Sequence, residues 1–212
     1  MGGRVIKINL MGAIFTIIII IAVIVGTVIL VTKFIPKNAN GNETTNNNST
    51  QNNSNEIDVN KMYTENVLVD GQKKEVTMKY YKSNLNYAMK FDVDIFYIDI
   101  SKENVDQFKS KYTDLVYLNI TKEKTNYSEK VNELNKKASN EVLQNSTYTI
   151  KETKVNNKTA VRAQKDDMTG TLITYIIEAK DGCYAIDIQC GKELKNTMIP
   201  IIEKMVESFI EI

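Results

Sequence analysis

The feature that most constrains the fold is an alternation of apolar and polar residues that recurs along residues 57–212. Apolar side chains occupy every second position at Val116, Leu118 and Ile120, and the same spacing returns in residues 173–177 and 184–188. Successive side chains of a strand point to opposite faces, so this spacing predicts strands with one buried face. The part of the chain after residue 56 is therefore expected to be built mainly from a sheet.

Three short turn sequences separate these strands. Asp70-Gly71 and Asp181-Gly182 carry the residue pair that favours the tight turn of a two-residue hairpin, and Asn156-Asn157 stands in the same position between two further strands. Hairpins that follow one another join neighbouring strands in opposite directions. The sequence therefore predicts an antiparallel sheet.

Two segments break the alternation with helical spacing. In residues 128–143, Ser128 is a suitable N-cap for a helix with one apolar stripe. A second helix is expected to begin near Asn196 or Thr197, because Pro200 is tolerated only in the first turn. The apolar stripes comprise Val131, Leu134, Ala138 and Val142 in the first helix, and Leu194, Met198, Ile201, Met205 and Phe209 in the second.

The N-terminal part of the chain differs sharply in composition from the rest. Residues 8–32 carry no charge, and about 20 apolar residues are enough for a helix to cross a bilayer. Arg4 and Lys7 precede this run and Lys33 and Lys37 follow it, so the two sides are nearly balanced in positive charge. The free α-amino group adds to the N-terminal side, which favours a cytoplasmic segment at 1–7 and an extracytoplasmic C-terminal part. We therefore expect a single-pass transmembrane helix at 8–32 and location in the cell membrane.

A polar segment follows the apolar run. Nine of the nineteen residues 38–56 are asparagine, and most of the others are Ser, Thr, Gln or Gly. Such a segment buries too little apolar surface to offset the entropy lost on ordering. We expect a disordered linker at 33–56, ahead of an α+β domain at 57–212. The predicted fold class is an antiparallel sheet flanked by two helices, preceded by one N-terminal transmembrane helix.

Composition narrows the range of functions. The net charge is +1, which disfavours nucleic acid as a partner. The chain has no histidine, so it has no imidazole base for a Ser or Cys nucleophile and lacks the commonest zinc ligand. Phosphate-binding glycine loops, CxxC pairs and GxSxG elbows are also absent from the sequence. We predict no catalytic, cofactor-binding or metal-ligating residue, and no cofactor.

Three groups of residues are nevertheless candidate sites. Cys183 and Cys190 are seven residues apart in one strand, so they are expected on opposite faces, buried and unpaired. Asp92, Asp94 and Asp99 raise the alternative of a cation site, but a solvated sheet face is the preferred interpretation. The third group consists of tyrosines, which are ordinary strand residues but also suit a binding groove. Its members are Tyr80, Tyr81, Tyr87, Tyr97, Tyr112 and Tyr117.

Several short motifs resemble those of PsbP-like domains, the relatives of the extrinsic photosystem II protein. Tyr81-x-Ser83 followed by YAMKFDV at 87–93 is similar to the opening of these domains, and the hairpin at 155–160 and the closing ESF at 207–209 fit the same pattern. The resemblance covers roughly residues 78–212. The chain departs from the family where a strand often runs into Pro and Trp, because Asp94 and Ile95 stand there.

The resemblance implies an antiparallel sheet flanked by helices in a non-catalytic binding or assembly module of a membrane-tethered bacterial protein. We therefore expect the membrane to be contacted through residues 8–32, and the partner to be a protein or another component of the cell envelope. Two alternatives remain open. One is an NTF2-like interaction subunit of an envelope secretion or conjugation machine, and the other is a cytoplasm-facing sensor if the topology is reversed.

Overall fold

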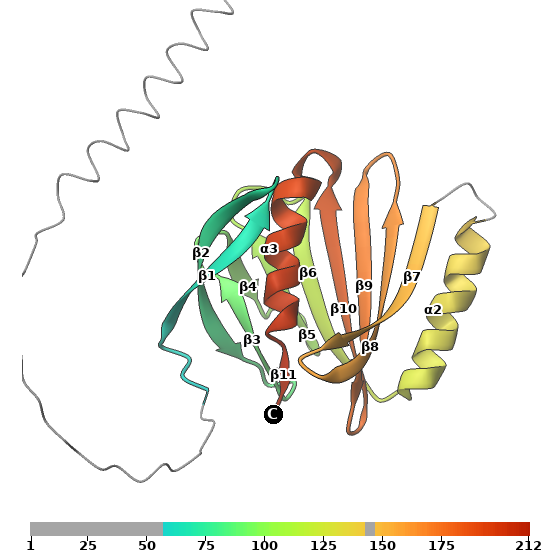
Figure 1. Ribbon diagram of the computed structural model, residues 1–212. Coiled ribbons are helices and arrows are strands. Elements are labelled where there is room, and N and C mark those ends of the chain that lie inside the picture. The colour runs from blue at the N-terminus through green and yellow to red at the C-terminus, as the bar shows by residue number, and fades with distance from the viewer. Residues whose placement is uncertain (1–56, 143–146) are drawn as a thin grey trace, which may run out of the picture. The chain divides into compact units, whose positions relative to one another are not determined.

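The computed structural model describes residues 57–142 and 147–212. These residues form strands β1 to β11, helices α2 and α3, and one 3-10 turn, η1 (Figure 1). All strand pairs are antiparallel, and the strands divide between a four-stranded and a seven-stranded sheet.

The four-stranded sheet has the order β1-β2-β3-β11. The tight turn Asp70-Gly71 joins β1 to β2, with φ angles of 49° and 78° at the two positions. Both angles lie in the left-handed region that Asp and Gly tolerate, so the predicted hairpin is confirmed. The strands are β1 (Met62–Val69), β2 (Gln72–Lys82), β3 (Tyr87–Asp92) and β11 (Ile210–Glu211).

The seven-stranded sheet has the order β4-β5-β6-β10-β9-β8-β7. The two other predicted hairpins are confirmed here, at Asn156-Asn157 between β7 and β8 and at Asp181-Gly182 between β9 and β10. The strands are β4 (Phe96–Asp99), β5 (Val105–Ser110), β6 (Val116–Glu123), β7 (Thr147–Val155), β8 (Lys158–Asp166), β9 (Gly170–Ala179) and β10 (Gly182–Gly191).

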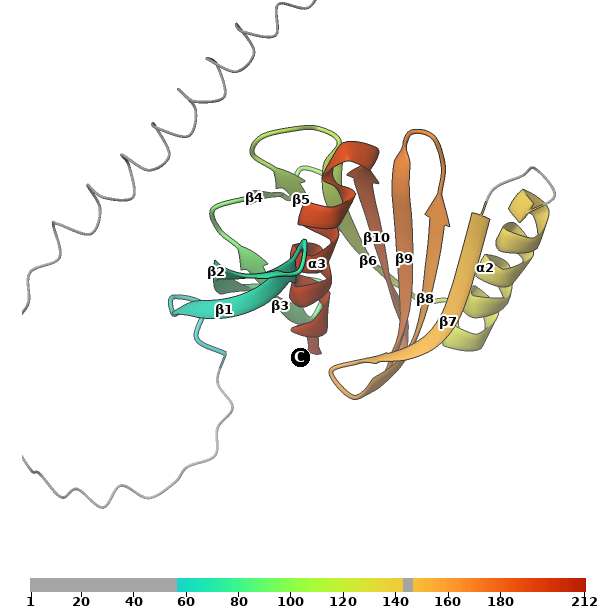
Figure 2. The same ribbon diagram turned by 45° about the horizontal axis from the view of Figure 1, so that its top comes forward.

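The helices contact opposite faces of the seven-stranded sheet. Helix α3 (Lys195–Glu207) follows η1 (Lys192–Leu194) and lies beside β1, β3 and β10 (Figures 1 and 2). The buried side chains of α3 pack with side chains from one face of each sheet to form the main core, and we call these faces the inner faces. Helix α2 (Tyr127–Val142) lies against β7, β9 and β10, where Leu134 packs into a second, smaller cluster. We call the face that α2 contacts the outer face.

The predicted single sheet flanked by two helices and preceded by a transmembrane helix is wrong for the described residues. The division into two sheets begins at Asp92, where Oδ1 accepts the backbone N–H groups of Asp94 at 2.9 Å and of Ile95 at 3.1 Å. This turn takes the chain out of the first sheet, and β4 then pairs with β5 instead of β3. Alternation in a sequence identifies strands but does not say which sheet each one joins.

No helix within residues 57–142 and 147–212 is long and apolar enough to span a bilayer. The predicted transmembrane helix at 8–32, the N-terminal segment at 1–7 and the linker at 33–56 lie outside the described residues. The prediction of a single-pass protein located in the cell membrane is therefore not supported by the described residues.

The helix boundaries differ slightly from those predicted. Asn126 caps α2 through its Oδ1, which accepts the N–H of Ser128 at 2.9 Å, so Ser128 is not the capping residue. Helix α3 begins at Lys195, and Pro200 lies inside it. The apolar stripe of α3 is confirmed, since Met198, Ile201 and Met205 are all buried in the main core.

Candidate functional site

A row of side chains crosses the outer face from one edge of the seven-stranded sheet to the other. The pairing register places these residues opposite one another on neighbouring strands, so the row runs perpendicular to the strands. We call it the tyrosine row. Its members, one from each strand in sheet order, are Tyr97, Lys109, Tyr117, Gln189, Leu172, Lys165 and Tyr148.

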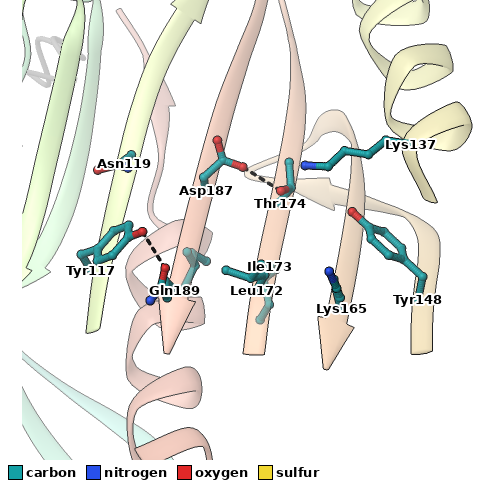
Figure 3. Close-up of a pocket in the computed structure, with 11 residues that line it drawn as sticks. Tyr117, Asn119, Lys137, Tyr148, Lys165, Leu172, Ile173, Thr174, Asp187 and Gln189 are labelled. Carbon is teal, nitrogen blue, oxygen red and sulfur yellow. Dashed lines mark hydrogen bonds between the residues drawn. The ribbon is translucent and has the colours of Figure 1, made fainter. Parts of the chain in front are cut away.

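Hydrogen bonds between strands hold the polar members of this face in place. The Tyr117 hydroxyl donates to Oε1 of Gln189 at 2.6 Å within the row (Figure 3). In the adjacent row, the Thr174 hydroxyl donates to Oδ1 of Asp187 at 2.7 Å, and Nε2 of Gln107 donates to Oδ1 of Asn119 at 2.6 Å. Each of these side chains is thus restrained before any ligand arrives.

A pocket of about 230 Å³ opens over the middle of the tyrosine row, where α2 meets the sheet. Five members of the row line it, all except Tyr97 and Lys109. Lys137 reaches in from α2 toward Thr174, and Asp187 lies on the β10 side (Figure 3). The lining thus combines aromatic surface, amide groups and charges of both signs.

The charges on this face are partly compensated. Nζ of Lys109 lies 2.7 Å from Oδ2 of Asp99, and this ammonium holds the pKa of the Asp99 carboxyl well below its usual range. Side chains of both signs line the pocket, with Lys137 and Lys165 positive and Asp187 negative.

A second polar cluster lies between the two sheets, around the buried carboxyl of Asp106 on β5. It accepts hydrogen bonds from the hydroxyl groups of Tyr87 at 2.7 Å, Tyr81 at 3.3 Å and Ser83. Burial is the main cause of the raised pKa of Tyr81, about 12, with the adjacent Asp106 adding to the rise. This cluster ties the two sheets together, since Tyr87 lies on β3 and Asp106 on β5.

The two cysteines lie where the spacing predicted. Cys183 faces α2 in the smaller cluster, whereas Cys190 faces the main core, and neither forms a disulfide. Burial raises the pKa of each thiol to about 11. Both are packing residues in this structure.

The three aspartates do not come together. Asp92 is buried and caps the turn after β3, and burial raises its pKa, so its predicted place on a solvated face is wrong. Asp99 pairs with Lys109 on the outer face. Across residues 57–142 and 147–212, no three His, Cys, Asp or Glu side chains are grouped so as to hold a metal ion.

The tyrosines named from the sequence have separate places. Tyr97 and Tyr117 belong to the tyrosine row, Tyr81 and Tyr87 to the Asp106 cluster, and Tyr112 is an exposed loop residue. Sequence reasoning missed Tyr148, Lys165 and Lys137. A signal was available for Tyr148 and Lys165. Each lies an even number of residues from positions expected to face outward, in strands predicted to pair, so both could have been assigned to the outward face.

No protein-family model matches the chain, and no curated protein matches its sequence. Among solved structures, the chain is similar to the solution structure of cyanobacterial PsbP (CyanoP) from Synechocystis sp. PCC 6803. The TM-score is 0.47 at 9% sequence identity, and the match covers 64% of this chain and 92% of that one. That structure is one of the PsbP-like proteins that the sequence motifs resemble, and the likeness to it is weak.

Proposed function

We propose that residues 57–212 form a non-catalytic binding module that holds a protein partner against the tyrosine row. The observation that carries the proposal is the row itself, in which three tyrosines and a leucine lie along the outer face beside a pocket. Tyrosine is enriched among the residues that dominate binding energy at protein interfaces.

The exposure of the row supports this role. Tyr97 is 45% exposed and Leu172 is 41% exposed, although both lie within regular strands. Large apolar side chains on a strand are usually buried on the core face, and these two point away from it. A partner that covered them would remove apolar surface from water, which favours association.

The rigidity of the face supports it as well. The bonds Tyr117–Gln189 and Thr174–Asp187 restrain side chains that a partner would contact. Side chains that are already ordered lose less conformational entropy on binding.

The experiment is site-specific photocrosslinking in the native host, using the full chain with a benzophenone amino acid in place of Leu172. A matched probe at Leu68 serves as the control, because Leu68 is 62% exposed on β1 of the other sheet. We expect one discrete adduct with another protein from position 172 and none with another protein from position 68. The captured protein is then identified and its affinity for the purified chain is measured.

Two variants decide the outcome. Tyr117→Ala should weaken binding of the identified partner by about tenfold or more, since it removes a central aromatic contact. Tyr112→Ala is the control, because Tyr112 is 77% exposed outside the row. Equal crosslinking to another protein at positions 68 and 172, or an unchanged affinity of Tyr117→Ala, would overturn the proposal.

A further inference from the structure

We propose that strand β1 pairs with β1 of a second copy of this chain, in an antiparallel arrangement centred on Glu65. The pairing joins two four-stranded sheets across a two-fold axis. Strand β1 belongs to the smaller sheet, so the inference does not rest on the function proposed for the tyrosine row. Three properties of β1 support it: its unpaired edge, its exposed side chains and the fit of the strand to itself.

Strand β1 is the outermost strand of the smaller sheet (Figure 2). No strand in the described part of the chain pairs with the side of β1 that faces away from β2, and we call this side the free edge of β1. In a two-residue hairpin the pair beside the turn is hydrogen-bonded, and the pairs alternate from there. Val69 and Gln72 flank the turn, so the odd-numbered residues of β1 bond to β2. The residues that direct their N–H and C=O groups to the free edge are Met62, Thr64, Asn66 and Leu68.

The other sheet edges formed by the described residues are short or charged. Strand β11 has two residues and β4 has four. Strand β7 has nine, but it carries Lys151, Glu152 and Lys154, and charged side chains commonly protect an edge against pairing. Strand β1 has eight residues without lysine or proline, and its one charged residue is Glu65. It is therefore the long edge with the least protection.

The side chains on one face of β1 are exposed. Met62 is 56% exposed and Leu68 is 62% exposed, and Thr64 and Asn66 between them are exposed as well. An edge strand with unpaired backbone groups and exposed apolar side chains is a template for pairing with another chain. Covering Met62 and Leu68 would remove apolar surface from water, which favours association.

The strand is complementary to itself. A two-fold axis perpendicular to the sheet keeps each face on its own side, so residues that lie opposite one another must belong to the same face. With the axis at Glu65, Met62 lies opposite Leu68 of the second copy, and Thr64 lies opposite Asn66. All four residues that point to the free edge are then hydrogen-bonded. If the axis moved to residue 64 or 66, one of the four would have no strand residue opposite it.

The carboxylates of Glu65, which meet at the axis, are already compensated within each copy. Oε1 contacts Nζ of Lys90, and Oε2 lies 3.7 Å from Nζ of Lys204 on α3. Both oxygens are thus directed at ammonium groups before the copies meet. The repulsion between the two carboxylates is reduced accordingly.

The test is disulfide crosslinking between two full chains with different tags, co-expressed in the native host. One chain carries Thr64→Cys and the other Asn66→Cys, and the lysate is oxidised with copper phenanthroline. Opposite residues of a hydrogen-bonded pair have Cα atoms about 5.5 Å apart, which a disulfide can bridge. We therefore expect a dimer that carries both tags and separates on reduction.

The matched control is the pair Lys73→Cys and Glu75→Cys on β2. Both residues are exposed, and they lie one strand further from the free edge on the same face of the sheet. In the paired copies they would be at least about 14 Å apart, at roughly 4.8 Å per strand, which is too far for a disulfide. The native Cys183 and Cys190 are buried, and every chain in the experiment carries them.

A charged residue on the edge tests the apolar contact. Leu68→Lys should lower the yield of the doubly tagged dimer by about fivefold or more, since it replaces a covered apolar side chain with a charge. Ile100→Lys is the control, because Ile100 is 66% exposed outside β1. Thermal melting confirms that each variant is folded, and Met62→Lys repeats the test at the other end of the strand.

The absence of the doubly tagged dimer, or an equal yield from the control pair on β2, would overturn the inference. An equal effect of Leu68→Lys and Ile100→Lys would overturn it as well. If the cysteines at positions 64 and 66 form an adduct with a different protein and no doubly tagged dimer, the edge belongs to that protein and the second copy is excluded.

Discussion

The hydroxyl of Tyr87 on β3 donates a hydrogen bond of 2.7 Å to Oδ2 of Asp106 on β5, which joins a strand of one sheet to a strand of the other. Tyr81 and Ser83 donate to the same carboxyl. Within residues 57–142 and 147–212 the two sheets share no backbone ladder. The Asp106 cluster therefore joins them by side-chain hydrogen bonds, in addition to the apolar core that lies between them.

Removal of one donor from this cluster should lower stability. Tyr87→Phe leaves the ring in place but takes a hydrogen bond from a buried carboxyl, and we expect a loss of about 1–3 kcal/mol in the free energy of unfolding. Urea denaturation measures it. Tyr112→Phe is the control, because its hydroxyl bonds to a backbone carbonyl at an exposed position. Equal midpoints for the two variants would contradict a role of the cluster in joining the sheets.

Stability should decrease at alkaline pH. The pKa of Tyr81 is raised to about 12 and that of each cysteine thiol to about 11, chiefly by burial. Between the ordinary pKa of these groups and the raised value, the folded chain binds more protons than the unfolded chain, so raising the pH favours unfolding. The stabilisation is fully present at pH 8 and is lost progressively toward pH 12. Urea midpoints at pH 8, 9.5 and 11 should fall in that order, and a constant midpoint would contradict the burial of these groups.

The ring of Phe209 should be a major contributor to the core. It is fully buried just beyond the end of α3, and its centroid lies 5.1 Å from that of Tyr87 and 4.9 Å from that of Tyr184. We expect Phe209→Ala to cost about 3–5 kcal/mol in the free energy of unfolding. Ile212→Ala, at a position that is 46% exposed, should change it by less than about 0.5 kcal/mol. Melting of Phe209→Ala like the wild type would show that this ring does not close the core.

The turn between β7 and β8 should depend on residues that tolerate positive φ. Asn156 and Asn157 have φ angles of 45° and 68°. A β-branched residue is strained there, so Asn157→Val should cost about 1–2 kcal/mol, whereas Asn157→Gly should be neutral or stabilising. Asn66→Val is the control, at an exposed position within β1 where valine suits a strand. Thermal denaturation of the three variants compares them, and equal effects at positions 66 and 157 would contradict the turn geometry.

The two thiols should be unreactive in the folded chain. Cys183 and Cys190 are fully buried, and their raised pKa leaves little thiolate at pH 8. We expect dithionitrobenzoate to modify neither thiol in the native protein and both in 6 M guanidinium chloride. Rapid modification of either thiol without denaturant would show that its cluster opens readily.

Features set by a few neighbouring residues could be predicted from the sequence. The two Asp-Gly pairs and the Asn-Asn pair each specify a hairpin by local backbone preference, and the odd spacing of Cys183 and Cys190 places them on opposite faces of one strand. The stripe of α3 was recognisable for the same reason. In each case the determining residues lie within a few positions of one another.

Features that depend on pairing between distant strands could not be predicted. The tyrosine row exists because Tyr117 is in register with Gln189, and Gln189 with Leu172, which no local pattern encodes. The division into two sheets depends on the turn at Asp92 and on β11 pairing with β3. The burial of Asp92 was missed because a carboxylate that caps a turn looks the same in sequence as one in solvent.

The pairing of β11 with β3 also bears on how the chain folds during synthesis. Ile210 pairs with Ala88, and Glu211 with Tyr87, so the fourth strand of the smaller sheet is made more than a hundred residues after the third. At roughly 5–20 residues per second, a ribosome needs on the order of ten seconds to cover that distance. Until then β3 has an unpaired edge and lacks the cover of α3, which makes the nascent chain a natural client for a chaperone that shields strand edges.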